Sequence, residues 1–205
     1  MAERAAKKLV LASGSRSRRQ MLEAAGLTFT VAPADLDERA IRETLSAGDT
    51  QVDPADVAEV LARAKAEAIS GEQRDTIVIG ADQVLALGDE IFEKPAGLDG
   101  ARAHLMTLSG RTHQLHSAVV LAEAGEIVWA HVDTASLTMR ALAPAFIDDY
   151  LSRAGAVVCE SVGAYQLESL GVQLFEHIEG DYFTILGLPL LPLLAELRLR
   201  GVIAS

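Results

Sequence analysis

The sequence of 205 residues contains a single cysteine, Cys159. One cysteine excludes a disulfide within the chain and a metal site built from several cysteines. A small buried core position is a more common place for a free cysteine than a catalytic site. The chain also lacks an apolar run of membrane-spanning length, and no apolar stretch typical of a signal peptide follows the charged residues 1–8. We therefore expect a cytoplasmic protein that does not enter a membrane.

Positive charge is scarce as well. The chain has 18 lysines and arginines against 29 aspartates and glutamates, a formal net charge of −11. Nucleic-acid binding relies on a basic surface that neutralises phosphates, so this balance argues against a general nucleic-acid-binding protein. The P-loop, the G-x-G-x-x-G fingerprint, the H-E-x-x-H zinc motif and the G-x-S-x-G nucleophile elbow are all absent. Any phosphate chemistry must therefore use another arrangement.

Apolar runs and turn residues alternate along the chain in an α/β pattern. Half of the residues are hydrophobic, and no repeat or low-complexity linker divides the chain, so we expect one domain over residues 1–205. The predicted strands cover residues 8–12, 29–32, 76–81, 84–87, 90–92, 112–122, 127–140 and 172–179. The predicted helices cover residues 17–25, 55–70, 99–108, 144–153 and 189–200. Strands and helices alternate before a hairpin region, which predicts a mixed sheet flanked by helices.

Residues 9–22 are typical of an anion site. An apolar strand leads into a Ser/Gly turn, and the helix after it carries Arg16, Arg18 and Arg19 in its first turns. Backbone N–H groups at such a turn point at anions, and arginine matches phosphate oxygens with two donors. The helix dipole opposes basic residues at this position, so helix stability does not account for them. Phosphate binding is the favoured interpretation; the alternative is a solvated basic face.

One acid follows a buried run of the sequence. Asp82 comes after the apolar residues 77–81, which predicts a position just past the end of a strand. Ligands bind at the carboxyl ends of strands in open α/β sheets, and a carboxylate there can hold a divalent metal or orient a water. The alternative is an ordinary turn residue, and the spacing favours neither.

Two lysines and one acidic segment are weaker signals. Lys94 lies between a glutamate and a proline, where it pairs either with phosphate or with a surface carboxylate. Lys65 falls inside the predicted helix 55–70, where the alternative to a site role is an ordinary lysine on the solvated face. Residues 35–38 form an acidic segment, which is predicted to be a loop.

His113 and His116 resemble a pair of metal ligands, but their spacing argues against a shared metal ion. Both lie in the predicted strand 112–122. Residues three apart in a strand point to opposite faces, so the two imidazoles do not reach one ion. We assign them no metal. His113 and Ser117 do share a face, which leaves a local polar role open.

A set of short motifs resembles the Maf family, the nucleoside triphosphate pyrophosphatases also called septum formation inhibitors. The likeness extends from about residue 9 to residue 194. The motifs are, in order, Ser13-Gly14-Ser15, Arg18-Arg19, Gly80-Ala81-Asp82-Gln83, Glu93-Lys94-Pro95, Leu108-Ser109-Gly110-Arg111-Thr112-His113 and Gly163-Ala164-Tyr165. The resemblance implies an elongated α/β fold with two lobes around a cleft, often homodimeric. It also implies hydrolysis of a nucleoside triphosphate to the monophosphate and pyrophosphate with Mg, Mn or Co.

The resemblance further implies roles for individual residues. Asp82 matches the family's general base and metal-binding acid, and Glu38 matches a second acid, which we expect to share the metal. The positions implied to bind substrate phosphates are Ser13, Ser15, Arg18, Lys65 and Lys94.

Three positions implied to select the base fall on Ser17, Gln83 and Glu168. The branch of the family acting on dTTP and UTP typically has Arg, Thr and Gln there. The branch acting on 7-methyl-GTP typically has Gln and Glu at the second and third positions, as here. The chain departs from the family pattern at Arg16, where proline is usual, at Ser17, where a bulky residue is common, and at Ser169, where glycine is usual.

The resemblance therefore favours a pyrophosphatase of the 7-methyl-GTP type. The alternatives are a dTTP/UTP-type pyrophosphatase, a nucleotide-binding regulator of septum formation, and a phosphatase for sugar phosphates or other non-nucleotide phosphates.

Overall fold

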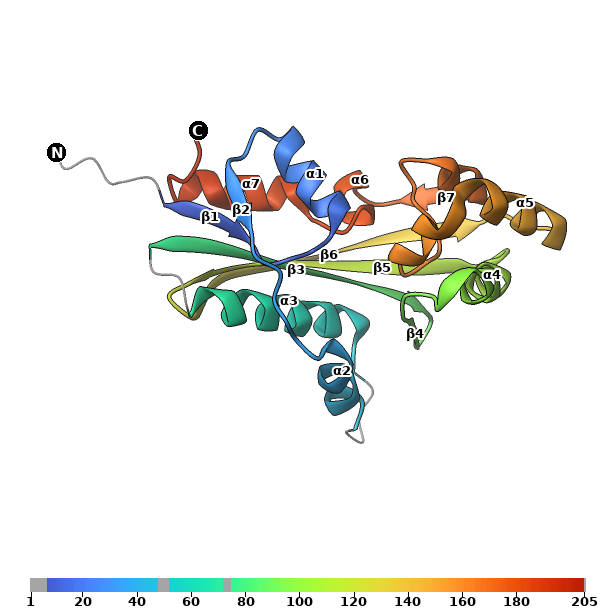
Figure 1. Cartoon of the computed structure of the whole chain (residues 1–205), viewed down its shortest axis with the longest axis horizontal. Helices are drawn as coiled ribbons and strands as arrows, with labels where there is room; N and C mark the ends of the chain where they lie inside the picture. The colour runs from blue at the N-terminus through green and yellow to red at the C-terminus, as the bar shows by residue number, and fades with distance from the viewer. Residues whose placement is uncertain (1–6, 48–51, 72–74, 205) are drawn as a thin grey trace.

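The computed structural model describes residues 7–47, 52–71 and 75–204, and these residues form a seven-stranded sheet (Figure 1). The strand order is β2-β1-β3-β5-β6-β7, and β4 pairs with β3. Pairing with β1 is parallel and every other pairing is antiparallel, so the predicted mixed sheet is confirmed. The strands are β1 (Lys8–Leu11), β2 (Phe29–Val31), β3 (Thr76–Leu87), β4 (Glu90–Phe92), β5 (Thr112–Glu123), β6 (Glu126–Met139) and β7 (Phe175–Glu179).

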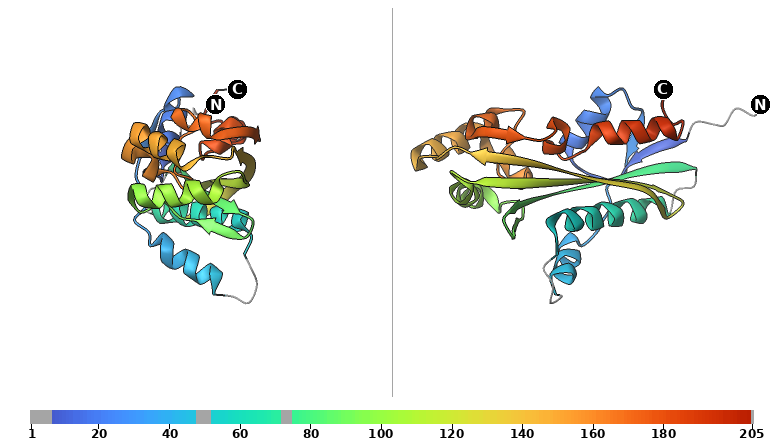
Figure 2. Two further views of the ribbon diagram at one scale, coloured as in Figure 1. Left: turned by 90° about the vertical axis from the view of Figure 1, so that its right-hand side faces the viewer. Right: turned by 180° about the vertical axis from the view of Figure 1, so that it is seen from behind.

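Helices flank the sheet on both faces. Figures 1 and 2 show α3 along one face, α1 and α7 along the other, and α4 and α5 at the far end of an elongated molecule. The helices are α1 (Arg16–Ala24), α2 (Glu38–Ser46), α3 (Pro54–Ser70), α4 (Gly97–Leu108), α5 (Pro144–Ala154), α6 (Tyr182–Ile185) and α7 (Leu190–Leu199), with 3-10 turns η1 (Gly155–Glu160) and η2 (Leu170–Leu174).

The core follows the alternation of side chains along the central strands. Leu9 and Ile77 pack with α1 and α7, whereas Val10 and Val78 pack with α3. Because both faces are covered, β1 and β3 are continuous apolar runs rather than alternating ones. A third cluster lies at the far end around α4 and α5, and Cys159 packs against it half-buried rather than within it.

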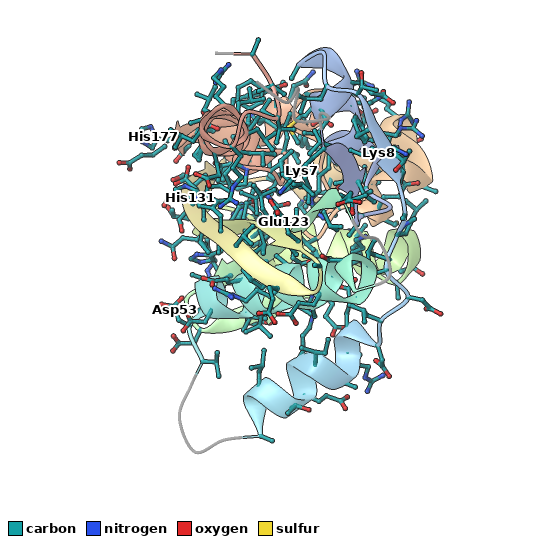
Figure 3. The ribbon with its side chains drawn as sticks, turned by 90° about the vertical axis from the view of Figure 1, so that its left-hand side faces the viewer. Lys7, Lys8, Asp53, Glu123, His131 and His177 are labelled. Atoms are coloured by element: carbon teal, nitrogen blue, oxygen red, sulfur yellow. The ribbon has the colours of Figure 1, made fainter. Side chains whose placement is uncertain are left out.

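An ion pair joins the residue before β1 to the last residue of β5. Lys7 and Glu123 lie side by side there (Figure 3), and their side chains form an ion pair. Arg200, just after α7, places Nη1 3.7 Å from Glu123 Oε1. The start of β1, the end of β5 and the end of α7 therefore meet at one charged cluster.

The course of β3 differs from the prediction. Residues 76–81 and 84–87 belong to one twelve-residue strand, so Asp82 lies within a strand and not past its end. On one side of β3, β1 pairs only with Thr76–Ile79 and β4 only with Leu85–Leu87. Between them, residues 80–84 have no neighbouring strand on that side in the described part of the chain. Asp82 therefore lies beside a gap beyond the carboxyl end of β1, whereas the ligand was expected past the end of the strand that precedes Asp82.

Two helices were not predicted. The acidic segment 35–38 is the entrance to α2, because Asp37 Oδ1 accepts a hydrogen bond of 2.9 Å from Ala40 N and caps that helix. Asp181 caps the short α6 in the same way, accepting from Phe183 N and Thr184 N. Acidic capping residues thus begin both helices that the sequence reasoning took for loop.

Gly80 lets α3 approach β3 closely. A Cβ atom at this position would lie 2.2 Å from Ala62 O and 2.8 Å from Ala66 Cβ. We expect Gly80→Ala to lower the free energy of unfolding by about 3 kcal/mol, because the helix must move away. Urea titration measures this, with Gly71→Ala at the open end of the same helix expected to change it by less than about 0.5 kcal/mol. Equal stabilities of the two variants would contradict the close packing.

Candidate active site

A cavity of about 770 Å³ opens at the gap beside β3. This volume lies within the range of sites for small ligands. The structure brings together in its lining every residue predicted to act on phosphate or metal: Ser13, Ser15, Arg18, Glu38, Lys65, Asp82 and Lys94. They come from α1, α2, α3, β3, the turn between β1 and α1, and the segment after β4, so the tertiary fold assembles the group.

The lining has an excess of positive charge. Six basic side chains, Arg16, Arg18, Arg39, Arg42, Lys65 and Lys94, face four acidic ones, Glu38, Asp82, Glu93 and Glu160. The whole chain carries a net charge of −11, so the cavity differs in sign from the rest of the molecule. Such a cavity attracts anions and discourages neutral ligands.

The Ser/Gly turn and Arg18 form one wall. Ser15 caps α1, its Oγ accepting from Arg18 N at 3.4 Å. The buried Arg18 guanidinium donates through Nε to Gly187 O at 2.8 Å, and through Nη1 to Ala81 O at 2.8 Å and Ser13 Oγ at 3.1 Å. Burial lowers the pKa of Arg18, opposed by nearby carboxylates. Arg18 thus joins three segments of the wall, with fewer donors left for substrate than the prediction assumed.

The other two arginines of this helix differ: one fits a solvated basic face and the other fits phosphate binding. Arg19 is exposed and pairs with Glu23 one turn later at 3.5 Å, as expected of a solvated face. Arg16 is at the cavity. The basic first turn of α1 therefore contributes one arginine to the solvated surface and one to the cavity.

Lys65 lies at the centre of the charged residues and not on the solvated face, which was the alternative for this lysine. It is 8% exposed, on the face of α3 that packs on the sheet. Its Nζ donates to Asp82 Oδ1 at 2.6 Å and lies 2.9 Å from Glu38 Oε1. The ammonium group therefore holds the two predicted metal-binding carboxylates in one place.

Asp82 keeps one oxygen free. Its Oδ2 is buried and accepts no hydrogen bond from the described residues, while Arg42 Nη2 lies 3.8 Å away. The Nη1 of Arg42 is also buried and has no partner in the described part of the chain. An unused acceptor and an unused donor thus remain on two residues that line the cavity.

Arg42 is a site residue that sequence reasoning missed. It sits one helical turn after Glu38, with Nη2 3.7 Å from Glu38 Oε2. Burial disfavours the charged form of Glu38, but Lys65, Arg42 and Lys94 outweigh it and hold the pKa of Glu38 below its usual value. Arg42 follows Glu38 by four residues at the start of a capped helix, and this spacing could have indicated that the two side chains lie together. The sequence analysis did not use it because α2 was not predicted.

A second, smaller cavity of about 50 Å³ adjoins the first. Ser17, Gln83 and Glu168 all line it, so the three predicted base-selecting positions converge from distant parts of the chain. Ser17 and Gln83 line both cavities. The layout places a small side pocket next to the charged site.

The histidines take separate partners, as their spacing predicted. His113 Nε2 forms a hydrogen bond of 2.8 Å with Tyr165 OH, and His116 Nδ1 one of 3.0 Å with Thr134 Oγ1. His131 and His177 lie at the surface (Figure 3). Among the described residues, no group of three or more His, Cys, Asp or Glu side chains could hold a metal ion.

His113 should make stability depend on pH. Burial lowers its pKa to about 4 from 6.5. Between these values the unfolded chain binds a proton that the folded chain does not, so the free energy of unfolding should fall as pH drops, by up to about 1.4 kcal/mol per pH unit. Urea titrations across this window should show a shallower slope for His113→Gln and an unchanged slope for His177→Gln, an exposed control. Equal slopes for wild type and His113→Gln would refute this.

Within the described ranges, no helix has both the length and the apolar character needed to cross a bilayer.

Comparison with known proteins identifies the family of the chain. Residues 8–200 match the family described as Maf-like protein. A 7-methyl-GTP pyrophosphatase from Mesorhizobium japonicum is 57% identical over 196 residues, covering 96% of this chain and 98% of that protein. One from Brucella abortus is 54% identical over 191 residues, covering 93% and 95%. A nucleoside triphosphate pyrophosphatase from Bradyrhizobium diazoefficiens is 52% identical over 196 residues, covering 96% and 95%. The chain therefore belongs to the Maf family.

Proposed function

We propose that this chain hydrolyses a nucleoside triphosphate to the monophosphate and pyrophosphate, and that 7-methyl-GTP is its preferred substrate. Family membership and the names of its relatives support the reaction. The observation that carries the proposal is a positively charged cavity with a buried carboxylate, Asp82, beside a side pocket lined by Gln83 and Glu168. A triphosphate suits the first cavity, and the second adjoins it where we place recognition of the base.

The triphosphate is bound by groups that surround Asp82. The capped start of α1 offers backbone N–H groups, and Lys65, Lys94 and Arg42 offer charged donors. The Nη1 of Arg42 has no partner among the described residues, so a bound phosphate would give this donor an acceptor. Arg18 mainly holds the wall in shape.

A divalent cation, Mg, Mn or Co, fits Asp82 and Glu38. Such hard ions prefer oxygen ligands, and magnesium in particular is often held by one or two carboxylates together with substrate phosphates and waters. The unpartnered Oδ2 of Asp82 is a suitable ligand atom. When bound, the cation lowers the pKa of a coordinated water and neutralises charge on the leaving pyrophosphate.

Residues of the chain carry out the other steps of hydrolysis. Asp82 orients a water, or takes its proton, for in-line attack on the α-phosphorus. The bond from the α-phosphorus to the bridging oxygen breaks, and pyrophosphate leaves. Lys65 and Arg42 stabilise charge that develops on the phosphate oxygens.

Glu168 is proposed to recognise the guanine edge. A guanine base presents two neighbouring donors, the N1–H and the N2 amine, whereas uracil and thymine present one. A carboxylate also suits the positive charge of 7-methylguanine. We expect Glu168→Gln to lower the ratio of kcat/KM for 7-methyl-GTP over UTP about tenfold. Glu176→Gln, an exposed change on β7, is the matched control; an unchanged ratio in Glu168→Gln would remove this role.

A substrate panel tests the proposed function. Pyrophosphate release is measured for 7-methyl-GTP, GTP, dTTP, UTP, CTP and ITP with magnesium or manganese. Preference for 7-methyl-GTP supports the proposal, and preference for dTTP or UTP keeps the reaction but overturns the base assignment. Orthophosphate instead of pyrophosphate indicates a phosphatase. No hydrolysis moves the weight to a nucleotide-binding regulator of septum formation.

The cellular compartment of the protein belongs to the same proposal. We place the reaction in the cytoplasm, and the homodimer and the two lobes implied by the family resemblance stay predictions.

A further inference from the structure

The amide of Gln83 is held in one orientation. Its Nε2 donates to Ser117 Oγ at 3.0 Å, Thr184 O at 3.1 Å and Ile185 O at 3.0 Å. Two of these acceptors are backbone carbonyls, which cannot donate, so the nitrogen must face them and the oxygen must face away. The Oε1 of Gln83 accepts no hydrogen bond within the described ranges and is left as a free acceptor at the two cavities.

A second layer of hydrogen bonds holds those acceptors. Ser117 Oγ donates to Thr184 O at 2.7 Å, and Thr184 Oγ1 donates to Asp133 Oδ2 at 2.9 Å. Ser117 and Thr184 are both fully buried. Since α6 spans only Tyr182–Ile185, these tertiary contacts and its Asp181 cap fix the position of its carbonyls.

A glycine lies beside the Gln83 oxygen. Gly187 has φ +94°, and a Cβ atom there would lie in ordinary contact, 3.5 Å from Gln83 Oε1 and 3.5 Å from Arg18 Nη2. The backbone conformation is the reason that glycine suits this position.

We propose that Asp133, Thr184 and Ser117 are positioning residues for base choice, acting by holding Gln83 with its oxygen toward the nucleobase. The inference rests on the proposed function and deepens it. With the amide fixed, the side pocket presents two acceptors, Gln83 Oε1 and the Glu168 carboxylate, to the two donors of a guanine edge. A rotated amide would present N–H groups instead and leave a donor of guanine unpaired, which weakens binding of guanine.

The test compares substitutions along this chain of hydrogen bonds. Thr184→Val and Asp133→Ala each remove the link between α6 and β6, and each should lower the ratio of kcat/KM for 7-methyl-GTP over UTP about tenfold. Asp133→Asn should retain the ratio, because an amide N–H can donate to the Thr184 hydroxyl while its oxygen still accepts from Thr134 N. Thr138→Val, elsewhere on β6, is the matched control. Thermal melting identifies variants that do not fold, and Asp133→Ala reports the same link if Thr184→Val is among them.

A double-mutant cycle separates positioning from general damage. Combined with Gln83→Ala, the Thr184→Val change should cause no further loss of selectivity, because both act through one amide. Ratios that stay at the wild-type value, or losses that add, would overturn the inference while wild-type pyrophosphate release left the proposed function standing. A wild-type protein that releases no pyrophosphate would instead overturn the proposed function.

Discussion

Asp82→Asn is expected to lower kcat/KM for pyrophosphate release from 7-methyl-GTP about a thousandfold. The amide keeps the shape of the side chain but removes the charge between Lys65 and Arg42 and the capacity to take a proton from water. The buried position, 5% exposed, and the free Oδ2 are the reasons for assigning this role. A coupled assay for pyrophosphate measures the change.

The fold of Asp82→Asn should survive, because Lys65 keeps its ion pair with Glu38. Near-ultraviolet circular dichroism checks this. Asp89→Asn, in the exposed turn between β3 and β4, is the matched control and should act like wild type. If Asp82→Asn kept more than about a tenth of the activity, Asp82 would be neither the base nor an essential metal ligand.

Lys65→Met is expected to have the second largest effect. The methionine fills similar space but leaves Asp82 and Glu38 without the ammonium group between them. Both the hold on the carboxylates and a charge facing the phosphates are lost, so kcat/KM should fall about a hundredfold. Lys8→Met, an exposed lysine at the start of β1, should leave the activity unchanged.

The pH dependence of Lys65→Met gives a sharper result. Burial acts to raise the pKa of Glu38, and Lys65 is the largest of the groups that lower it below its usual value. Without Lys65 the pKa of Glu38 should rise, so activity that needs the ionised carboxylate is lost at a higher pH on the acid side. A plot of kcat/KM against pH shows the shift. Identical acid limbs for wild type and variant would mean that Lys65 does not act through Glu38.

Local patterns predicted most of the fold. The predicted helix 55–70 corresponds to α3, which Asp53 caps, and the predicted strands 112–122 and 127–140 correspond to β5 and β6, which a turn at Ala124-Gly125 joins. These elements were predictable because capping and turn chemistry is local. The break expected after Ala81 was wrong because polar residues interrupt the apolar run. Those residues continue the strand since their side chains face a cavity rather than solvent.

Long-range contacts limited the prediction of the site. The helical pattern alone suggested an ordinary solvated lysine at position 65, and only the family resemblance implied a site role. Lys65 lies on a stripe of α3 shared with the buried alanines Ala58, Ala62 and Ala66. A charged residue on such a stripe is stabilised only by carboxylates from other elements, which helical periodicity cannot reveal. The link from Asp133 to Gln83 likewise joins residues fifty positions apart in the chain, through hydrogen bonds that no local pattern encodes.

The most direct measurement is hydrolysis of 7-methyl-GTP in water enriched in the heavy oxygen isotope, with the products analysed by mass spectrometry. Attack on the α-phosphorus beside Asp82 predicts 7-methyl-GMP that carries the heavy oxygen, together with unlabelled pyrophosphate. Heavy oxygen in the pyrophosphate, or release of orthophosphate with 7-methyl-GDP, would contradict the reaction assigned to this cavity.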